Sequence, residues 1–254
     1  LRNAINSGDI SYHDVPLGQM PVWVKNHFLK PVDVAIIEAA AIDENGNIIP
    51  TTSVGTSNIY AECADKIIIE VNTYVPTCIE GVHDVCSPAR PPHTKPIPIE
   101  KVGDRIGTPY IKCDPSKVVA IVESYIPDNG RIVSPVDDEF RQMAANLIDF
   151  LHSEVRADHL CDPLPPLQAG VGSVSNAVLE GLAKSDFEHM TVYSEVLQNS
   201  IFDLIDAGKV DFASGTSLTI SADRRDDFFR HFDKYRDKII LRPQEISNHP
   251  EVIR

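Results

Sequence analysis

Short runs of apolar and β-branched residues alternate along the chain with amphipathic stretches and polar turns. This alternation predicts an α/β fold with open, largely parallel and partly mixed sheets. We expect strands at residues 32–42, 66–71, 117–123, 190–193, 209–213 and 238–241. The turn sequence DENGN at 43–47 lies between two apolar segments and predicts a hairpin, and with it an antiparallel portion of sheet in residues 30–80.

The clearest helical pattern begins near Ser134, which can cap a helix, and Pro135, which suits its first turn. Apolar residues then recur at helical spacing, and we interpret their stripe as a face packed into the core: Phe140, Met143, Leu147, Phe150 and Leu151. The five prolines in residues 88–98 predict an extended surface segment. A second proline cluster at residues 161–166 predicts a rigid linker and a domain boundary.

The composition is typical of a globular protein, since 43% of the 254 residues are hydrophobic and 24% are charged. A net charge of −14 argues against nucleic acid or an anionic membrane surface as a partner, because both are bound through neutralisation of phosphates. The apolar runs are all shorter than the ~18 residues that a membrane helix needs. A small anionic ligand is still compatible, since a helix N-terminus with one or two cations can hold a phosphate.

Five cysteines, an odd number in a chain of this length, favour a reducing compartment over a disulfide framework. Four residues in and around a proline-rich stretch offer metal-ligating side chains: Cys78, His83, Cys86 and His93. Their spacing does not match the close cysteine pair of common zinc sites. We therefore interpret this stretch as a structured polar loop and predict no metal site.

The residues that follow the second proline cluster carry the first chemical signal. The sequence LQAGVGSVSNAVL at 167–179 predicts a short strand, a turn at Gly170 and Gly172, and a helix that begins at residues 173–175. Glycines permit a close backbone approach, and the free N–H groups of a helix start can bind an anion or a developing oxyanion. A plain strand-to-helix turn accounts for the glycines equally well.

The second signal is Glu195, which follows the strand predicted at 190–193 and opens a helix expected to run through Leu197 to Gly208. Ligands gather at the carboxyl ends of strands in open α/β sheets, although a glutamate in a first helical turn often serves only the helix dipole. Two functional interpretations follow. The glycine turn could begin a dinucleotide site, although Ser175 replaces the third glycine of that motif. Alternatively, Glu195 could be a nucleophile that faces oxyanion donors of the turn.

Three stretches resemble the acetyl-CoA hydrolase/transferase family, and within it most closely the succinyl-CoA:acetate CoA-transferases: QAGVGSVSNAV at 168–178, YSEVLQ at 193–198 and LIDAGK at 204–209. Further agreement, in the family's order, lies in ADKIIIEVN at 64–72, GVHD at 81–84, DRIG at 104–107, FAS at 212–214 and SNHPEVI at 247–253. The resemblance covers essentially the whole chain and selects the nucleophile interpretation.

The resemblance implies a CoA-transferase-type fold of two similar α/β domains with the active site between them. Residues 1–160 then correspond to the C-terminal part of the first domain, and residues 161–254 to the N-terminal part of the second domain, which carries the glutamate. Because members of the family are about twice as long, we expect this fold to be incomplete at both ends. The absent residues include a glycine-rich stretch with a second oxyanion donor, so we expect this chain alone to be inactive.

In chemical terms, the resemblance implies transfer of CoA between short-chain carboxylic acids such as acetate and succinate. Glu195 matches the glutamate that forms a glutamyl-CoA thioester, Val171 a backbone N–H donor of the oxyanion hole, and Asn248 a polar residue that contacts the reacting carboxylate. The CoA site matches residues in and before the glycine turn: Pro165, Pro166, Leu167, Gln168, Ala169, Gly170 and Gly172. CoA is then a substrate, and no metal or redox cofactor is implied.

Several alternatives stay open at this point. Water in place of the second carboxylate makes the protein an acetyl-CoA hydrolase, and a non-catalytic CoA- or dinucleotide-binding module keeps the same fold. The exchanged acids are not determined, and neither is the basic group that meets the CoA phosphates, for which Arg105, Lys112 and Arg131 are candidates. We expect a homodimer that binds acyl-CoA and small carboxylates, in the cytoplasm or, for a eukaryotic protein, in mitochondria.

Overall fold

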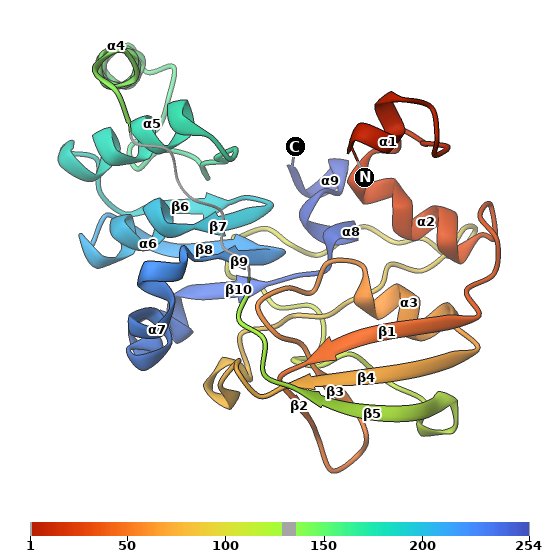
Figure 1. Ribbon diagram of the computed structural model, residues 1–254. Coiled ribbons are helices and arrows are strands. Elements are labelled where there is room, and N and C mark those ends of the chain that lie inside the picture. The colour runs from red at the N-terminus through yellow and green to blue at the C-terminus, as the bar shows by residue number, and fades with distance from the viewer. Residues whose placement is uncertain (1, 129–135, 254) are drawn as a thin grey trace.

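The computed structural model describes residues 2–128 and 136–253 and shows two three-stranded parallel sheets with helices around them (Figure 1). The first sheet has the strand order β1-β4-β5, and the second has the order β10-β8-β6. Two further strand pairs accompany them, β2 with β3 and β7 with β9. The predicted α/β fold with largely parallel sheets is confirmed, and each of the six predicted strand regions contains a strand.

The first sheet forms from the β-branched runs of the N-terminal half: β1 Val34–Ala39, β4 Lys66–Asn72 and β5 Val118–Ser124. The antiparallel pair β2, Ala41–Ile42, and β3, Ile48–Ile49, flanks the predicted turn, where Asp43 Oδ1 accepts the backbone N–H groups of Asn45 and Asn47. The predicted hairpin is therefore confirmed. The helices of this region are α1 Arg2–Asn6, α2 Met20–Lys25 and α3 Ser57–Cys63.

The second sheet has β8 at its centre and β6 and β10 parallel on either side: β6 Met190–Tyr193, β8 Val210–Gly215 and β10 Ile239–Leu241. Because the strands are parallel, their carboxyl ends meet at one edge of the sheet. Beyond that edge the chain continues into the parallel pair β7, Val196–Gln198, and β9, Ser217–Thr219. The helices of this region are α5 Ser173–Lys184, α6 Asn199–Asp206, α7 Ala222–Arg230, α8 Gln244–Ser247 and α9 Pro250–Ile253.

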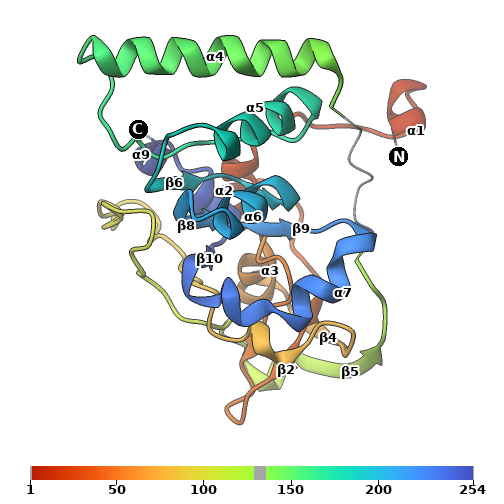
Figure 2. The ribbon, with the colours of Figure 1, turned by 90° about the vertical axis from the view of Figure 1, so that its left-hand side faces the viewer.

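Helix α4, Asp138–Arg156, lies outside the sheets and packs along α5 (Figure 2). Its N-cap is Asp137, whose side chain accepts the backbone N–H of Phe140 at 2.8 Å. Ser134 and Pro135, which were predicted to start the helix, lie outside the described residues. The helix itself is confirmed.

The predicted core face of α4 is wrong for the larger part of its stripe. The contact with α5 uses Ala144, which is buried, and Ile148, whose side chain lies where Gly181 of α5 leaves room for it. A Cβ at residue 181 would stand 2.6 Å from Ile148 Cδ1. The contact with α5 thus uses residues outside the predicted stripe, and three apolar residues of the stripe are exposed: Met143, Leu147 and Phe150.

A single hydrophobic core cluster extends through both sheets. Leu241 at the end of β10 exchanges backbone hydrogen bonds with Val82 and Asp84, at 2.9 and 2.8 Å, so the GVHD motif lies along the edge of the second sheet. Helix α4 precedes the predicted domain boundary at residue 160 and contacts α5, which follows it. The division into two domains stays a prediction.

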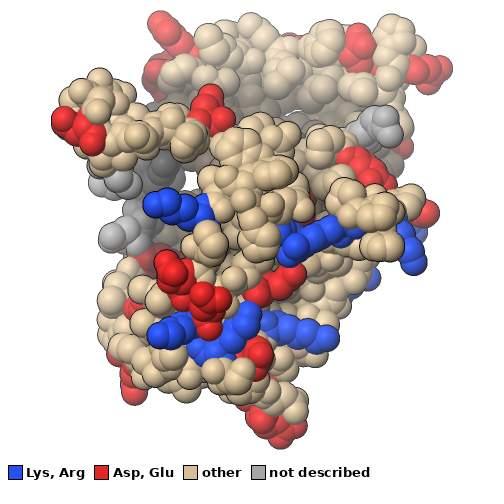
Figure 3. All heavy atoms as spheres, turned by 90° about the vertical axis from the view of Figure 1, so that its right-hand side faces the viewer, with Lys and Arg blue, Asp and Glu red and all other residues tan. Residues whose placement is uncertain are grey.

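Two further findings concern the length of the helices and the charge on one face of the molecule. None of the helices in the described parts of the chain is both long and apolar enough to cross a membrane. On the face shown in Figure 3, Lys and Arg side chains lie among Asp and Glu side chains and do not merge into one basic surface.

Candidate active site

A cavity of about 650 Å³ opens at the carboxyl end of β6. It brings together five residues that were predicted for the site from distant parts of the sequence: Pro165, Pro166, Gln168, Glu195 and Asn248. The other predicted residues around the glycine turn do not line it: Leu167, Ala169, Gly170, Val171 and Gly172.

Glu195 lies in the break between β6 and β7, half-buried, with its side chain on the cavity. The predicted helix does not begin here, because the residues after Glu195 form β7, and α6 starts only at Asn199. The reason is tertiary: β7 pairs in parallel with β9. In the same way the backbone carbonyl of Glu195 accepts the N–H of Thr216 at 2.8 Å. Glu195 is therefore held by its backbone at the wall of the cavity.

Gly215, the last residue of β8, makes this arrangement possible. A Cβ at that position would stand 2.8 Å from Leu197 Cγ and 3.3 Å from the carbonyl oxygen of Glu195. The glycine therefore lets the backbone on either side of the glutamate pass close to β8.

The segment before α5 runs beside β6 as a short extension of the second sheet. Leu167 donates its N–H to Thr191 O at 2.8 Å and accepts the N–H of Tyr193 at 2.9 Å. Helix α5 begins at Ser173, as predicted. The glycine turn and the helix start are thus present as predicted, whereas the predicted strand is reduced to an isolated bridge between Leu167 and Val192.

Two side chains that flank Glu195 hold the glycine turn, residues 169–172. Ser194 Oγ donates to Ala169 O at 2.9 Å, and Gln198 Nε2 donates to Gly170 O at 3.2 Å. Two carbonyl oxygens of the turn, those of Ala169 and Gly170, are therefore bound by side chains near Glu195. Val171 in the middle of the turn is 52% exposed, so its side chain contributes little to packing.

Asn248 directly follows α8 and is partly buried on the cavity wall. Its backbone N–H and its side-chain Nδ2 both donate to Gln244 O, at 3.0 and 3.3 Å, so it closes the last turn of α8. The helix is anchored by a buried ion pair between Glu245 and Lys25 of α2, at 3.0 Å. Gly18 also approaches Asn248 closely, since a Cβ at that glycine would stand 2.8 Å from Asn248 O.

Tyr193 links the two sides of the cavity, and sequence reasoning did not single it out. Its hydroxyl donates to Ile246 O at 3.0 Å, which joins the residue two positions before Glu195 to the residue two positions before Asn248. Burial raises the pKa of Tyr193 to about 12, so the phenol keeps its proton and remains a donor at neutral pH. The partner that reveals this role lies more than fifty positions away in the sequence, at the end of another element.

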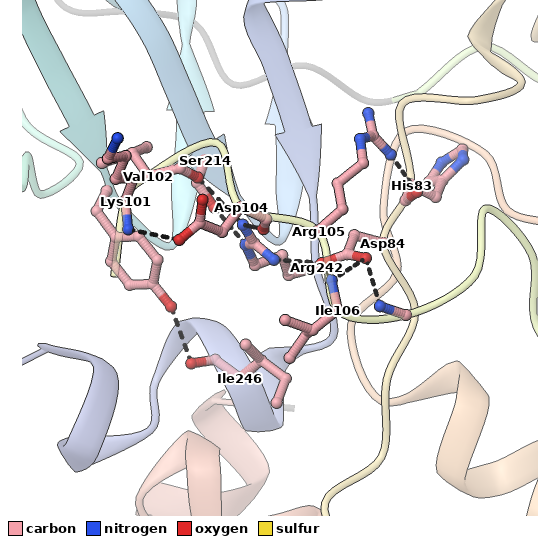
Figure 4. Close-up of polar contacts among 12 residues, drawn as sticks. His83, Asp84, Lys101, Val102, Asp104, Arg105, Ile106, Ser214, Arg242 and Ile246 are labelled. Atoms are coloured by element: carbon pink, nitrogen blue, oxygen red, sulfur yellow. Dashed lines mark hydrogen bonds and ion pairs between the residues drawn. The ribbon is translucent and has the colours of Figure 1, made fainter. Parts of the chain in front are cut away.

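A buried arginine lies behind the opposite wall of the cavity (Figure 4). Arg242, which follows β10, is fully buried and pairs through Nη1 with the equally buried carboxylate of Asp84. Its Nε donates to Ser214 Oγ at 3.0 Å. Its Nη2 donates to the backbone carbonyl oxygens of Val102, at 3.1 Å, and of Asp104. Burial lowers the pKa of Arg242, while the charge of Asp84 opposes that shift.

The carbonyl groups that Arg242 binds belong to the lysine loop, residues 99–104, which forms that wall. Inside the loop, Asp104 Oδ2 accepts the backbone N–H groups of Glu100 and Lys101, at 2.9 and 2.8 Å. These two bonds hold the pKa of Asp104 below its usual value. The loop is therefore closed on itself and tied to the core.

Two of the three residues predicted as candidates for the CoA phosphates, Arg105 and Lys112, do not line this cavity. Arg105 Nη1 donates to His83 O at 2.9 Å, and Lys112 lines a separate cavity of about 790 Å³. Arg131 lies outside the described residues. Among the described lining residues the cation is Lys101, which was not predicted for the site.

The cysteine and histidine residues considered for zinc do not come together. The described residues contain no group of three or more His, Cys, Asp or Glu side chains placed to hold a metal ion. His83 is fully buried, and its Nε2 lies 2.9 Å from Thr51 O. The proline-rich segment 88–98 has no helix or strand and is largely exposed, as predicted.

Comparison with known proteins connects this geometry to one family. Residues 1–123 match the acetyl-CoA hydrolase/transferase N-terminal domain. An acetyl-CoA hydrolase from Schizosaccharomyces pombe is 44% identical, over 100% of this chain and 50% of that protein. A succinyl-CoA:acetate CoA-transferase from Clostridium kluyveri is 43% identical, over 100% of this chain and 47% of that protein.

Solved structures agree at the level of the fold. The 4-hydroxybutyrate CoA-transferase from Porphyromonas gingivalis is 19% identical and has a TM-score of 0.65, with 95% of this chain and 52% of that chain covered. RipA from Yersinia pestis is 21% identical and has a TM-score of 0.66, with 99% of this chain and 50% of that chain covered. At this level of identity the likeness shows the fold alone.

The relatives carry both hydrolase and transferase names at nearly equal identity, so the expected resemblance to the transferase subgroup is not separated from a resemblance to the hydrolases. The chain spans about half the length of the curated relatives it matches. Since it matches these proteins along its whole length at 43% and 44% identity, the chain belongs to the acetyl-CoA hydrolase/transferase family.

Proposed function

We propose that the protein transfers CoA between short-chain carboxylic acids and that Glu195 is its nucleophile. The observation that carries this proposal is the place of Glu195, on the wall of a cavity shared with Asn248 and Gln168 at the carboxyl end of a parallel strand. Its backbone is held by β8 and β9, so the carboxylate approaches a bound thioester from a defined position.

The proposed reaction has two linked steps. The carboxylate of Glu195 attacks the acyl-CoA carbonyl and expels the CoA thiolate, which leaves an acyl-glutamyl anhydride. The thiolate then attacks the glutamyl carbonyl, forms a glutamyl-CoA thioester and releases the first carboxylic acid as its anion. A second carboxylate runs the same steps in reverse. The covalent intermediate divides one difficult exchange into easier ones, with CoA as a substrate and no metal or redox cofactor.

The proposal assigns the surrounding groups as follows. The backbone N–H of Val171 donates to the oxyanion, because it lies just before the start of α5, where N–H groups lack helical partners. Asn248, which lines the cavity directly after α8, contacts the reacting carboxylate. Residues 165–170 and Gly172 form the CoA side, and of these Pro165, Pro166 and Gln168 already line the cavity.

Hydrolysis of acetyl-CoA is the second candidate function, and the 44% identity to a protein named acetyl-CoA hydrolase favours it. In that reaction water resolves the glutamyl intermediate in place of the second carboxylate. Incubation of the protein with acetyl-CoA, with and without succinate, separates the two. A transferase forms succinyl-CoA only when the acid is present, whereas a hydrolase releases free CoA in its absence.

The role of Glu195 is tested by the exchange rate of Glu195→Gln. The substitution keeps the shape of the side chain but removes its negative charge, so we expect exchange to fall by about 1000-fold or more. Glu188→Gln is the matched control, since Glu188 is exposed and pairs with Lys209 on the surface at 3.3 Å. Retention of appreciable exchange by Glu195→Gln would show that the nucleophile is a different group.

A further inference from the structure

The charges on the cavity wall are unequal. Four of its lining residues have formally charged side chains: Glu100, Lys101, Glu195 and Glu251. Lys101 is therefore the single cation among the described lining residues, against three carboxylates. The proposed substrates, acyl-CoA and carboxylic acids, are anions that three of these four groups repel.

Lys101 stands on a backbone that the core holds in place. Its own N–H and that of Glu100 are bound by Asp104 Oδ2, at 2.8 and 2.9 Å. The next residue, Val102, is buried, and its carbonyl oxygen is bound by Arg242. The side chain of Lys101 is exposed and lines the cavity, while its neighbour points into the protein.

The buried ion pair behind the loop makes this position costly to change. Arg242 is paired with Asp84, and Asp84 in turn accepts the backbone N–H of Gly107 at 2.7 Å. Displacement of the lysine loop would leave the buried Nη2 of Arg242 without its two acceptors, the carbonyl oxygens of Val102 and Asp104, which is unfavourable. The loop therefore presents its ammonium group to the cavity from a preorganised backbone.

We propose that Lys101 is the substrate-binding residue that holds an anionic group of the substrate remote from the reacting carbonyl. The chemistry of that group is a carboxylate or a phosphate, either the distal carboxylate of a dicarboxylic acceptor or a phosphate of CoA. A lysine suits this role because its ammonium is a compact point charge on a flexible stem. The inference rests on the proposed function for the location of the reacting carbonyl.

The test compares Lys101→Met with Lys101→Arg in steady-state exchange, with acetate and with succinate as acceptors. If Lys101 holds the distal carboxylate, Lys101→Met raises KM for succinate about fivefold and leaves KM for acetate unchanged. If it holds a CoA phosphate, KM for acyl-CoA rises by a similar factor and neither acid is affected. In both cases kcat stays within about twofold, because the group is not at the reacting atoms, and Lys101→Arg restores binding.

Direct binding keeps this inference separate from the proposed function. Calorimetric titration with CoA and with succinate requires no turnover, so it reports on Lys101 even if Glu195 is not the nucleophile. Lys112→Met is the control, since Lys112 lines the other cavity. A weaker Kd for either ligand in Lys101→Met, but not in Lys112→Met, supports the inference. Unchanged KM and Kd values for both ligands in Lys101→Met would overturn it.

Discussion

Two segments near Glu195 are held in opposite ways: the lysine loop, which lines the cavity, and the glycine turn, which adjoins the cavity without lining it. The lysine loop is fixed from behind by Arg242 and Asp84, two charged side chains that are almost wholly buried and paired with each other. The glycine turn is exposed, and a Cβ added at Gly170 or Gly172 would meet nothing within 4 Å. Two of its carbonyl groups, those of Ala169 and Gly170, are bound by the side chains of Ser194 and Gln198.

This difference matches the role that is proposed for each segment. A side chain that binds a remote anion benefits from a rigid base, and burial of a paired charge supplies one. Backbone N–H groups that meet a developing oxyanion must instead remain accessible, and an open glycine turn leaves them so. We therefore expect the lysine loop and its buried ion pair to contribute mainly to stability, and the glycine turn to contribute mainly to the reaction.

The largest expected effect is a loss of stability when the buried ion pair behind the lysine loop is broken. Arg242→Met removes one partner of a buried pair and leaves Asp84 charged and buried, so we expect the free energy of unfolding to fall by about 3–5 kcal/mol. Urea unfolding followed by circular dichroism measures it. The double variant Arg242→Met/Asp84→Asn should recover part of the loss, since it removes the stranded charge. A loss below about 1 kcal/mol in the single variant would show that the ion pair does not support the lysine loop.

A substitution in the glycine turn should lower the reaction rate rather than the stability. Val171→Pro removes the backbone N–H, and we expect kcat to fall about 100- to 1000-fold, the usual effect of losing one oxyanion donor. Val171→Ala keeps the N–H and trims a solvent-exposed side chain, so its kcat should stay within about twofold.

Circular dichroism and the Kd for CoA show whether the Val171→Pro variant is folded. If this folded variant kept nearly the full kcat, the N–H of Val171 would not be an oxyanion donor.

Acid should act on the support of the lysine loop rather than on the glycine turn: His83 precedes Asp84 and accepts a hydrogen bond from Arg105 through its carbonyl oxygen, whereas the glycine turn has no titratable side chain. Burial lowers the pKa of His83 from 6.5 to about 4. Below pH 6.5 the unfolded chain takes up a proton that the folded protein does not, so stability contributed by His83 is full above pH 6.5 and is lost as the pH falls toward 4. The expected loss is about 3 kcal/mol.

The free energy of unfolding of the wild type and of His83→Gln, measured at pH 7 and near pH 4.5, isolates this contribution. The variant cannot titrate at that position, so its stability should fall less between the two pH values. Equal losses in both proteins would mean that His83 is protonated in the folded state as readily as in the unfolded chain.

Local pattern was sufficient to predict much of the fold. The six strand regions, the hairpin at 43–47, and the glycine turn followed by α5 depend on neighbouring residues, and all are confirmed. The helix expected directly after Glu195 was wrong because β7 pairs with β9, a partner some twenty residues further along the chain. The apolar stripe of α4 was misassigned because the contact with α5 is made by Ala144 and Ile148, which lie outside that stripe.

The candidate site divides in the same way. Glu195 and Asn248 were predicted through family resemblance, and the structure brings both to one cavity. Lys101, Tyr193 and Arg242 were not predicted, since their roles depend on contacts between residues far apart in the sequence. A lysine in a polar turn has no local feature that distinguishes a cavity wall from open surface.

The central claim is that Glu195 becomes covalently attached to CoA, and trapping that thioester tests it most directly. The protein is treated with acetyl-CoA, reduced with borohydride and digested, and the peptide that contains Glu195 is analysed by mass spectrometry. We predict that its glutamyl side chain is converted to the alcohol, only when acyl-CoA is present and not in Glu195→Gln. An unmodified Glu195 in protein that turns over acyl-CoA, or reduction at another carboxylate such as Glu251, would contradict the account.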